Sequence, residues 1–267
     1  NRNFYKLGLH MTSAITITAL SNFPDIRCGD NIIEILSKCL ELEKISLVDG
    51  DVVCVAHKIL SKAEGRLVAL STIVPSEEAF FYAKKLNKDP RKVEVILQES
   101  TKVIRDFKHK NQNEGVMICQ HRLGFISANA AIDESNIEEV DHVLLLPIDP
   151  DKSASKLRTE LETKFNICVG VVITDTFGRP WRLGQVNVAI GLSGIPCTLP
   201  EQGQLDAYGR KLSVTEPAFC DEIAAASGLI TRKAGKTPVT IFRGLSWVKQ
   251  ESKAVDILRS EKENMFL

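Results

Sequence analysis

Apolar residues recur along the chain in patterns that are typical of strands. Residues 14–20 alternate between apolar and polar positions, whereas residues 51–56, 143–146, 168–174 and 238–242 are nearly continuous apolar runs rich in Val, Ile and Leu. Alternation with a period of two predicts a strand that is buried on one face, and a continuous apolar run predicts a strand that is buried on both faces.

Helical spacing of apolar residues separates several of these predicted strands. Residues 30–42 predict a helix with Asp30 as its N-cap. Residues 76–100 predict two helices that are divided near Pro90, because proline interrupts a helix. Strands and helices are mixed without strict βαβ alternation, which favours the α+β class. Further helices are predicted for residues 149–165 and 215–230.

The apolar run 168–174 is followed by polar residues that suggest a site for a metal and a phosphate. Asp175 and Thr176 supply oxygen ligands where we expect the strand to end, and parallel strands place ligand sites at that edge. Arg179 and Arg182 follow on a Gly- and Pro-containing loop, and a guanidinium group matches phosphate oxygens in pairs. The alternative is a polar turn that carries a surface ion pair.

Two further polar stretches follow predicted strands. His57, Lys58 and Lys62 come after the apolar run 51–56 and form a second candidate site for an anion; without further context, a solvated basic loop is the slightly favoured interpretation. Asp133 and Asn136 lie in a polar turn, where such residues also act as simple turn caps.

Composition limits the classes of partner. The chain has 267 residues, and its 34 Lys and Arg residues equal its 34 Asp and Glu residues. With no net charge to attract nucleic acid or an anionic membrane, any anion site must be local, and we expect neither partner. Seven Cys residues are scattered without a C-x-x-C pair, which favours a reducing, cytoplasmic location. We expect residues 1–10, before Met11, to lie outside the folded region 11–267.

Several motifs occur together in one order. They include Thr174-Asp-Thr-Phe-Gly-Arg-Pro-Trp-Arg182 and Ala128-Asn-Ala-Ala-Ile-Asp-Glu-Ser-Asn136. Together these motifs resemble the coenzyme F-420-0:L-glutamate ligase (gamma-glutamyl ligase) family over roughly residues 15–245. The other members of the set are residues 51–66, Glu99-Ser100 with Arg105, and residues 145–154, 206–212, 221–225 and 243–244.

This resemblance implies a GTP-dependent and divalent-metal-dependent carboxylate–amine ligase. In that reaction, GTP phosphorylates a carboxylate of the deazaflavin precursor, and the amine of L-glutamate then displaces phosphate to form an amide. The implied fold is α+β, with two tightly associated mixed α/β subdomains and an intertwined homodimer. Mg²⁺ or Mn²⁺ is the implied metal, and K⁺ is allowed as a further cation.

The resemblance also assigns residues to roles. It implies metal ligands at Asp133, Asp175 and Thr176, and we assign charge neutralisation at the transferred phosphate to Arg179 and Arg182. An acidic metal ligand of the family falls about where Lys233 stands, and because an ammonium group cannot bind a metal, we assign Lys233 to phosphate. The implied nucleotide contacts are Phe23, Pro24, His57, Lys58, Lys62 and Asn136.

The sequence leaves two alternative functions open. The same chemistry could act on a different carboxylate acceptor, because no motif encodes the contacts to the acceptor. A nucleotide-binding homologue that has lost catalysis is the other alternative, and Lys233 is the residue that motivates it.

Overall fold

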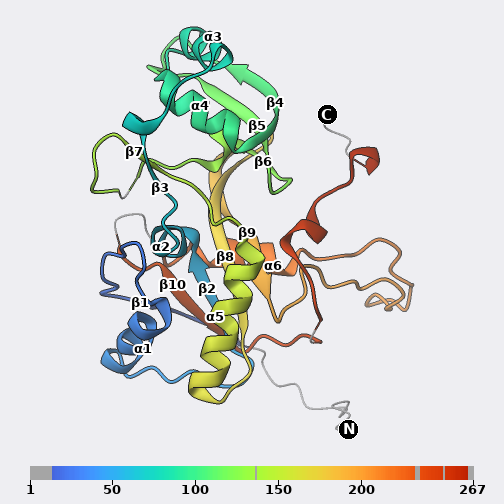
Figure 1. Cartoon of the computed structure of the whole chain (residues 1–267). Coiled ribbons are helices and arrows are strands. Elements are labelled where there is room, and N and C mark those ends of the chain that lie inside the picture. Colours follow the sequence, from blue (N-terminus) through green and yellow to red (C-terminus); the bar gives the residue numbers. More distant parts are fainter. Residues whose placement is uncertain (1–13, 136, 232–234, 249, 264–267) are drawn as a thin grey trace.

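The computed structural model describes residues 14–135, 137–231, 235–248 and 250–263 of the chain. They form two lobes (Figure 1), and the larger lobe is built around a five-stranded sheet of order β1-β10-β2-β8-β9. This mixture of helices and sheets confirms the predicted combination of α and β structure. The strands of the large sheet are β1 (Thr16–Leu20), β2 (Val52–Ala56), β8 (Gly170–Arg179), β9 (Arg182–Ser193) and β10 (Val239–Arg243).

Three strands of this sheet run in the same direction. β2 pairs in parallel with β8, and β10 is antiparallel to both β1 and β2. The carboxyl ends of β1, β2 and β8 therefore lie at the same edge of the sheet, the arrangement that favours a ligand site.

Helices cover both faces of the large sheet, as the continuous apolar runs predict. Alternate residues of β2 point to opposite faces: Val53 and Val55 pack with one core cluster, and Val52 and Cys54 pack with another. The first face is covered by α1 (Ile32–Leu42), α2 (His57–Ala63) and α5 (Pro150–Phe165), and the second by α6 (Phe219–Ser227).

The smaller lobe contains a three-stranded sheet and two helices, at the top of Figure 1. A two-stranded sheet of β3 (Leu67–Ala69) and β7 (His142–Leu144) lies between the two lobes. The elements of the smaller lobe are α3 (Glu77–Leu86), α4 (Pro90–Gln98), β4 (Ser100–Phe107), β5 (Val116–His121) and β6 (Ile126–Ala128). Short 3₁₀ helices span Leu70–Thr72, Asn129–Ala131, Ala254–Ile257 and Glu261–Glu263.

A buried ion cluster around Glu99 connects the lobes. The Glu99 carboxylate accepts hydrogen bonds from Arg66 at 3.0 Å and from Arg122 at 2.9 Å, and its Oε2 lies 3.4 Å from His121 Nε2. Arg122 also donates to the carbonyl oxygen of Pro147. Burial alone would raise the pKa of Glu99, but His121 and the two guanidinium groups outweigh it and lower the pKa to about 2.

Three predicted element boundaries and one predicted loop were wrong. Asn31, not Asp30, caps α1, since its side chain accepts from the backbone N–H groups of Ile33 and Glu34. The basic stretch after β2 is helix α2 and not a loop. β8 continues past Thr176 because β9 pairs with it from Val171 to Arg179. α6 begins at Phe219, later than the predicted start near residue 215.

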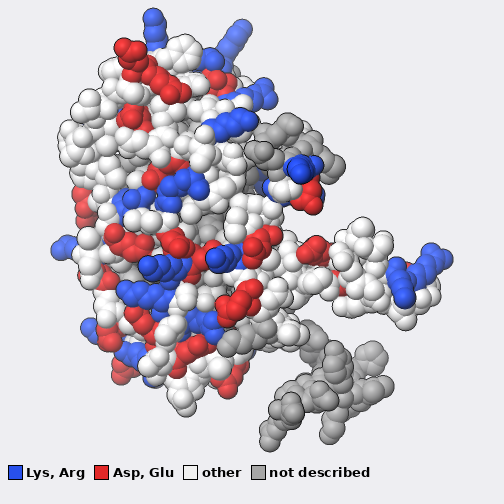
Figure 2. Space-filling view, turned by 45° about the vertical axis from the view of Figure 1, so that its right-hand side comes forward, with Lys and Arg blue, Asp and Glu red and all other residues white. Residues whose placement is uncertain are grey.

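A hairpin-like arm, residues 199–216, extends away from the larger lobe (orange in Figure 1; Figure 2 shows it projecting to the right). Its base is joined by backbone hydrogen bonds from Leu199 to Pro217 and from Glu201 to Thr215. Large apolar side chains on the arm are exposed, with Tyr208 at 88% and Leu205 at 63%.

On the face in Figure 2, acidic and basic residues are intermixed. No helix in the described part of the chain is long and apolar enough to cross a membrane.

Candidate active site

The shared edge of β2 and β8 brings His57 and Asp175 together. Ala56 and Thr174 are register partners in the parallel pair, so the next residue of each strand lies just beyond the paired region. There His57 Nε2 is 3.3 Å from Asp175 Oδ1, and His57 Nδ1 is 3.1 Å from Ser61 Oγ. His57 is 1% exposed. The imidazole thus lies between the Ser61 hydroxyl and the Asp175 carboxylate, and its buried Nε2 makes no hydrogen bond to the described residues.

Lys58, the next residue of α2, contacts a second carboxylate. Its Nζ lies 2.5 Å from Asp133 Oδ2 and donates to the hydroxyl and carbonyl oxygens of Ser135. The backbone N–H of Ser135 donates to Asp133 Oδ1 at 2.6 Å. Burial raises the pKa of Asp133, but Lys58 and Ser135 outweigh it and hold this pKa below its usual range. Asp133 and Asp175 are therefore held by adjacent residues of one helix.

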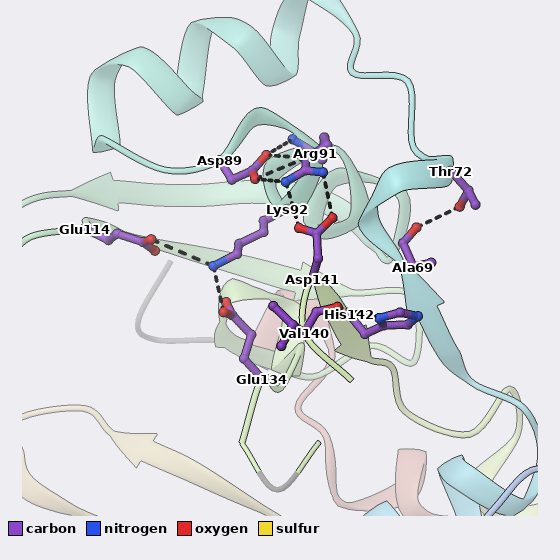
Figure 3. Close-up of polar contacts among 10 residues, drawn as sticks. All are labelled: Ala69, Thr72, Asp89, Arg91, Lys92, Glu114, Glu134, Val140, Asp141 and His142. Carbon is purple, nitrogen blue, oxygen red and sulfur yellow. Dashed lines mark hydrogen bonds and ion pairs between the residues drawn. The ribbon is translucent and has the colours of Figure 1, made fainter. Parts of the chain in front are cut away.

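The loop that carries Asp133 is fixed to the smaller lobe at two points (Figure 3). Lys92 Nζ on α4 lies 2.6 Å from Glu134 Oε2, and Arg91 forms two hydrogen bonds with Asp141 at 2.8 and 2.9 Å. Asp133 itself exchanges two backbone hydrogen bonds with Leu144. These contacts make the position of the Asp133 carboxylate depend on how the smaller lobe packs.

Asp175 and Thr176 lie inside β8, and the prediction that they end the strand is wrong. They do mark the point where β8 leaves β2 and continues only as a hairpin with β9, so their place at the sheet edge is retained. Thr176 N–H donates to Asp175 Oδ1 at 2.7 Å, and Thr176 Oγ1 donates to Asn187 Oδ1 at 2.8 Å.

Arg179 and Arg182 are not brought into this cluster. They flank the turn of the β8–β9 hairpin, where both are exposed, and Arg179 Nη2 donates to the carbonyl oxygen of Leu183. Four residues of extended chain separate Arg179 from Asp175, which is about 13 Å. Their assignment to the transferred phosphate stays a prediction.

The remaining predicted nucleotide contacts have different surroundings. Phe23 and Pro24 follow β1 at the same sheet edge, but the Phe23 ring is 3% exposed and belongs to the core, so only Pro24 presents its side chain to solvent. Lys62 lies in the last turn of α2 and is half-buried. Asn136 and Lys233 lie outside the described residues.

The oxygen donors at this edge fit a hard divalent cation. Asp133, Asp175 and Thr176 offer two carboxylates and a hydroxyl, the kind of ligand that Mg²⁺ and Mn²⁺ prefer. As consecutive residues of β8, Asp175 and Thr176 point to opposite faces of the sheet, Asp175 toward His57 and Thr176 toward Asn187. Among the described residues, no three His, Cys, Asp or Glu side chains already converge as a metal site.

Comparison with known proteins connects this geometry to a family. The family described as F420-0:Gamma-glutamyl ligase matches residues 21–244, which include β2, β8 and the polar residues that follow them at this edge. The chain belongs to the F420-0:gamma-glutamyl ligase family. Proteins named coenzyme F420:L-glutamate ligase are similar to it along most of their length. The one from Methanopyrus kandleri is 42% identical over 249 residues, covering 90% of this chain and 93% of that protein. The one from Methanothermobacter thermautotrophicus is 36% identical over 255 residues, covering 94% and 98%.

In this member of the gamma-glutamyl ligase family, several polar residues at the site were not predicted from sequence. Ser61 and Ser135 contact His57 and Lys58 directly, but a single serine in a helix or a loop gives no pattern that would single it out. Asn187 contacts Thr176, and it could have been found, because Val186 and Val188 on either side of it give the alternation of a strand.

Proposed function

We propose that this chain is a GTP- and divalent-metal-dependent ligase that joins a carboxylate of the deazaflavin coenzyme F420-0 to the amine of L-glutamate. Membership of the gamma-glutamyl ligase family supports the reaction class. The observation that carries the placement of the site is the pair of contacts His57–Asp175 and Lys58–Asp133 at one sheet edge.

The proposed reaction has two steps. A carboxylate is a poor acyl donor, so its oxygen first attacks the terminal phosphorus of GTP, and GDP leaves. The ammonium group of glutamate first loses a proton to become an amine, which attacks the acyl carbon. Phosphate leaves with the electron pair of the broken C–O bond, and the nitrogen loses a second proton to give the neutral amide. Phosphoryl transfer depends mainly on positioning and on neutralisation of charge, which ionic side chains at a sheet edge supply.

We assign a separate role to each of the described residues at the site. Asp133 and Asp175 would hold a divalent metal on the α2 side of the sheet edge, and Thr176 would offer its oxygen from the α6 side. The metal would neutralise phosphate oxygens and align them for attack. Lys58 Nζ lies against Asp133 Oδ2, so a metal that takes this oxygen would displace the ammonium group, which could then contact a phosphate oxygen. His57 keeps Asp175 oriented through its Nε2, and Ser61 holds the opposite side of the ring.

We also propose that the chain acts as a homodimer. The arm of residues 199–216 exposes Leu205, Tyr208 and Val214 on a projecting segment, and such apolar surface favours contact with another protein. A second copy of the chain is the partner that the resemblance implies.

The reaction is tested directly with purified protein, F420-0, L-glutamate, GTP and MgCl₂ or MnCl₂. Mass spectrometry should show F420-0 extended by one glutamyl unit, with one GDP formed for each amide. Omission of the metal or of the nucleotide should abolish the product. The absence of an amide with either GTP or ATP, with both metals and with other carboxylate acceptors, would contradict the proposal.

A further inference from the structure

A chain of hydrogen bonds leads from Thr176 to the end of α6. Thr176 and Asn187 are directly opposite in the β8–β9 pair, and Thr176 Oγ1 donates to Asn187 Oδ1 at 2.8 Å. Asn187 Nδ2 donates to Ser227 Oγ at 3.1 Å, and Ser227 Oγ donates to the carbonyl oxygen of Ala224 at 2.6 Å. Four groups on three elements are thus connected in series.

The direction of these bonds is fixed from the α6 end. A hydroxyl group has one proton, and the proton of Ser227 is used on the Ala224 carbonyl, so its Oγ can only accept from Asn187. The NH₂ end of the Asn187 amide therefore faces Ser227, and its carbonyl end faces Thr176. Because that oxygen can only accept, Thr176 must donate its single proton there, which leaves the lone pairs of Oγ1 for another partner.

The Asn187 amide is enclosed between the β8–β9 hairpin and the end of α6. Ser227 is 3% exposed, and Thr176 and Asn187 are half-buried between the strands and α6. Gly228 lies directly against the amide, since a Cβ atom added there would be 3.4 Å from Asn187 Nδ2. The hydrogen bonds to Ser227 and from Thr176 therefore decide which end of the amide faces Thr176.

We propose that Asn187 and Ser227 are positioning residues that hold Thr176 as a purely accepting oxygen ligand for the divalent metal. A hydroxyl binds a cation through a lone pair, and a proton directed at the cation would weaken that bond. Removal of a group that orients a metal ligand in this way commonly lowers the affinity for the metal. This inference rests on the proposed metal-dependent function.

The test is Mn²⁺ binding to the full chain with GDP present, measured by electron paramagnetic resonance. Ser227→Ala removes one buried oxygen and lets the Asn187 amide turn its NH₂ end toward Thr176, so that the threonine proton points into the site. Asn187→Ala removes the acceptor altogether. We expect both variants to raise the Mn²⁺ dissociation constant about tenfold or more.

Thr231→Val is the matched control. Thr231 Oγ1 donates to the backbone carbonyl of Ser227 at 2.9 Å, so this variant loses one hydrogen bond at the same helix end without touching the side-chain series. Its Mn²⁺ dissociation constant should stay within about twofold of the wild-type value even if its melting temperature falls. In a Thr176→Val background, Asn187→Ala should add little, because interacting residues are not additive.

The outcomes separate this inference from the proposed function. Wild-type Mn²⁺ affinity in Ser227→Ala and Asn187→Ala, or full additivity of Asn187→Ala with Thr176→Val, would overturn the inference and leave the function intact. A wild-type protein that binds no Mn²⁺ with either GDP or GTP would overturn both. If Asn187→Ala does not fold, Ser227→Ala alone decides the question, because it deletes only one atom.

Discussion

The Asp175 carboxylate is constrained by two neighbours before any ligand is bound. Its Oδ1 accepts the Thr176 N–H and faces His57 Nε2, and the imidazole is held in turn by Ser61. A carboxylate fixed in this way needs little rearrangement when a cation arrives, which is the kind of preorganisation that makes charged groups effective in catalysis.

Asp175→Asn tests this role at the scale of one residue. The amide fills the same volume, and its oxygen can still accept from Thr176, so we expect the fold and melting temperature to be retained. Loss of the charge should lower turnover roughly a hundredfold and weaken Mn²⁺ binding. Thr176→Val, which removes a neutral ligand, should cost less. A single titration that measures turnover and Mn²⁺ affinity separates these effects, and an unchanged Mn²⁺ affinity in Asp175→Asn would reject the metal role.

Part of this site could be predicted from the sequence, because its polar residues directly follow strand patterns. His57, Lys58 and Asp175 could be placed at one edge once two buried strands were recognised. Contacts such as Ser61 with His57, or Ser227 with Asn187, depend on how helices rotate against the sheet. Rotation of a helix is decided by packing and leaves no local signal.

At the scale of elements, a helix boundary could be predicted where a proline or a capping residue marks it. Pro90 predicted the division between α3 and α4, and the structure shows Pro90 in the first turn of α4 with Asp89 as its N-cap. α2 was missed because it has only seven residues, too few for a helical period to stand out, and its stability comes from packing of Ile59 and Leu60. The second half of β8 was missed because only its pairing with β9 makes Asp175 and Thr176 extended.

The Glu99 cluster predicts how the junction between elements responds to acid. Glu99 is the C-cap residue of α4, and its pKa of about 2 is below the ordinary value of 4.5. A carboxyl group whose pKa is lowered on folding contributes stability above the unfolded pKa and loses it as the pH falls through the folded pKa. The contribution should therefore decline between about pH 5 and pH 2, and its upper limit is about 3 kcal/mol.

Urea unfolding of wild type and Glu99→Gln from pH 7 to pH 2.5 measures this contribution. The difference in unfolding free energy should be largest near pH 7 and should shrink steadily below pH 5. Glu41→Gln, which changes an exposed carboxylate on α1, should follow the wild-type pH dependence. A Glu99→Gln curve that stays parallel to wild type throughout would show that the cluster does not stabilise the charged carboxylate.

At the scale of the whole molecule, the arm of residues 199–216 predicts self-association. Replacing Leu205 and Tyr208 together with Ser should raise the dimer dissociation constant by at least about tenfold, since apolar area removed from water drives such contacts. Sedimentation velocity over a range of protein concentrations measures this. Val74→Ser, at an exposed apolar residue outside the arm, is the control. A wild-type protein that stays monomeric at high concentration would contradict the prediction.

The mixture of helices and strands could be predicted from the sequence, whereas the order of the strands could not. Short apolar runs identify β2, β8 and β10, but nothing local shows that β10, near the end of the chain, inserts between β1 and β2. That choice is made by burial of Val239 and Ile241 in the core, which is a property of the complete fold.

The parallel pairing of β2 with β8 has a consequence for the time course of folding. Val52 and Gly170 are partners although more than a hundred residues separate them, and all the intervening chain must be arranged before they meet. Pairings over such distances slow folding, because the entropy of closing the loop is lost before the contacts form. His57 and Asp175 come together only when this pair forms, so a chain that ends before β8 would lack half of the proposed metal site. During refolding, Mn²⁺ binding should therefore appear with the slowest phase and not with the early formation of helices.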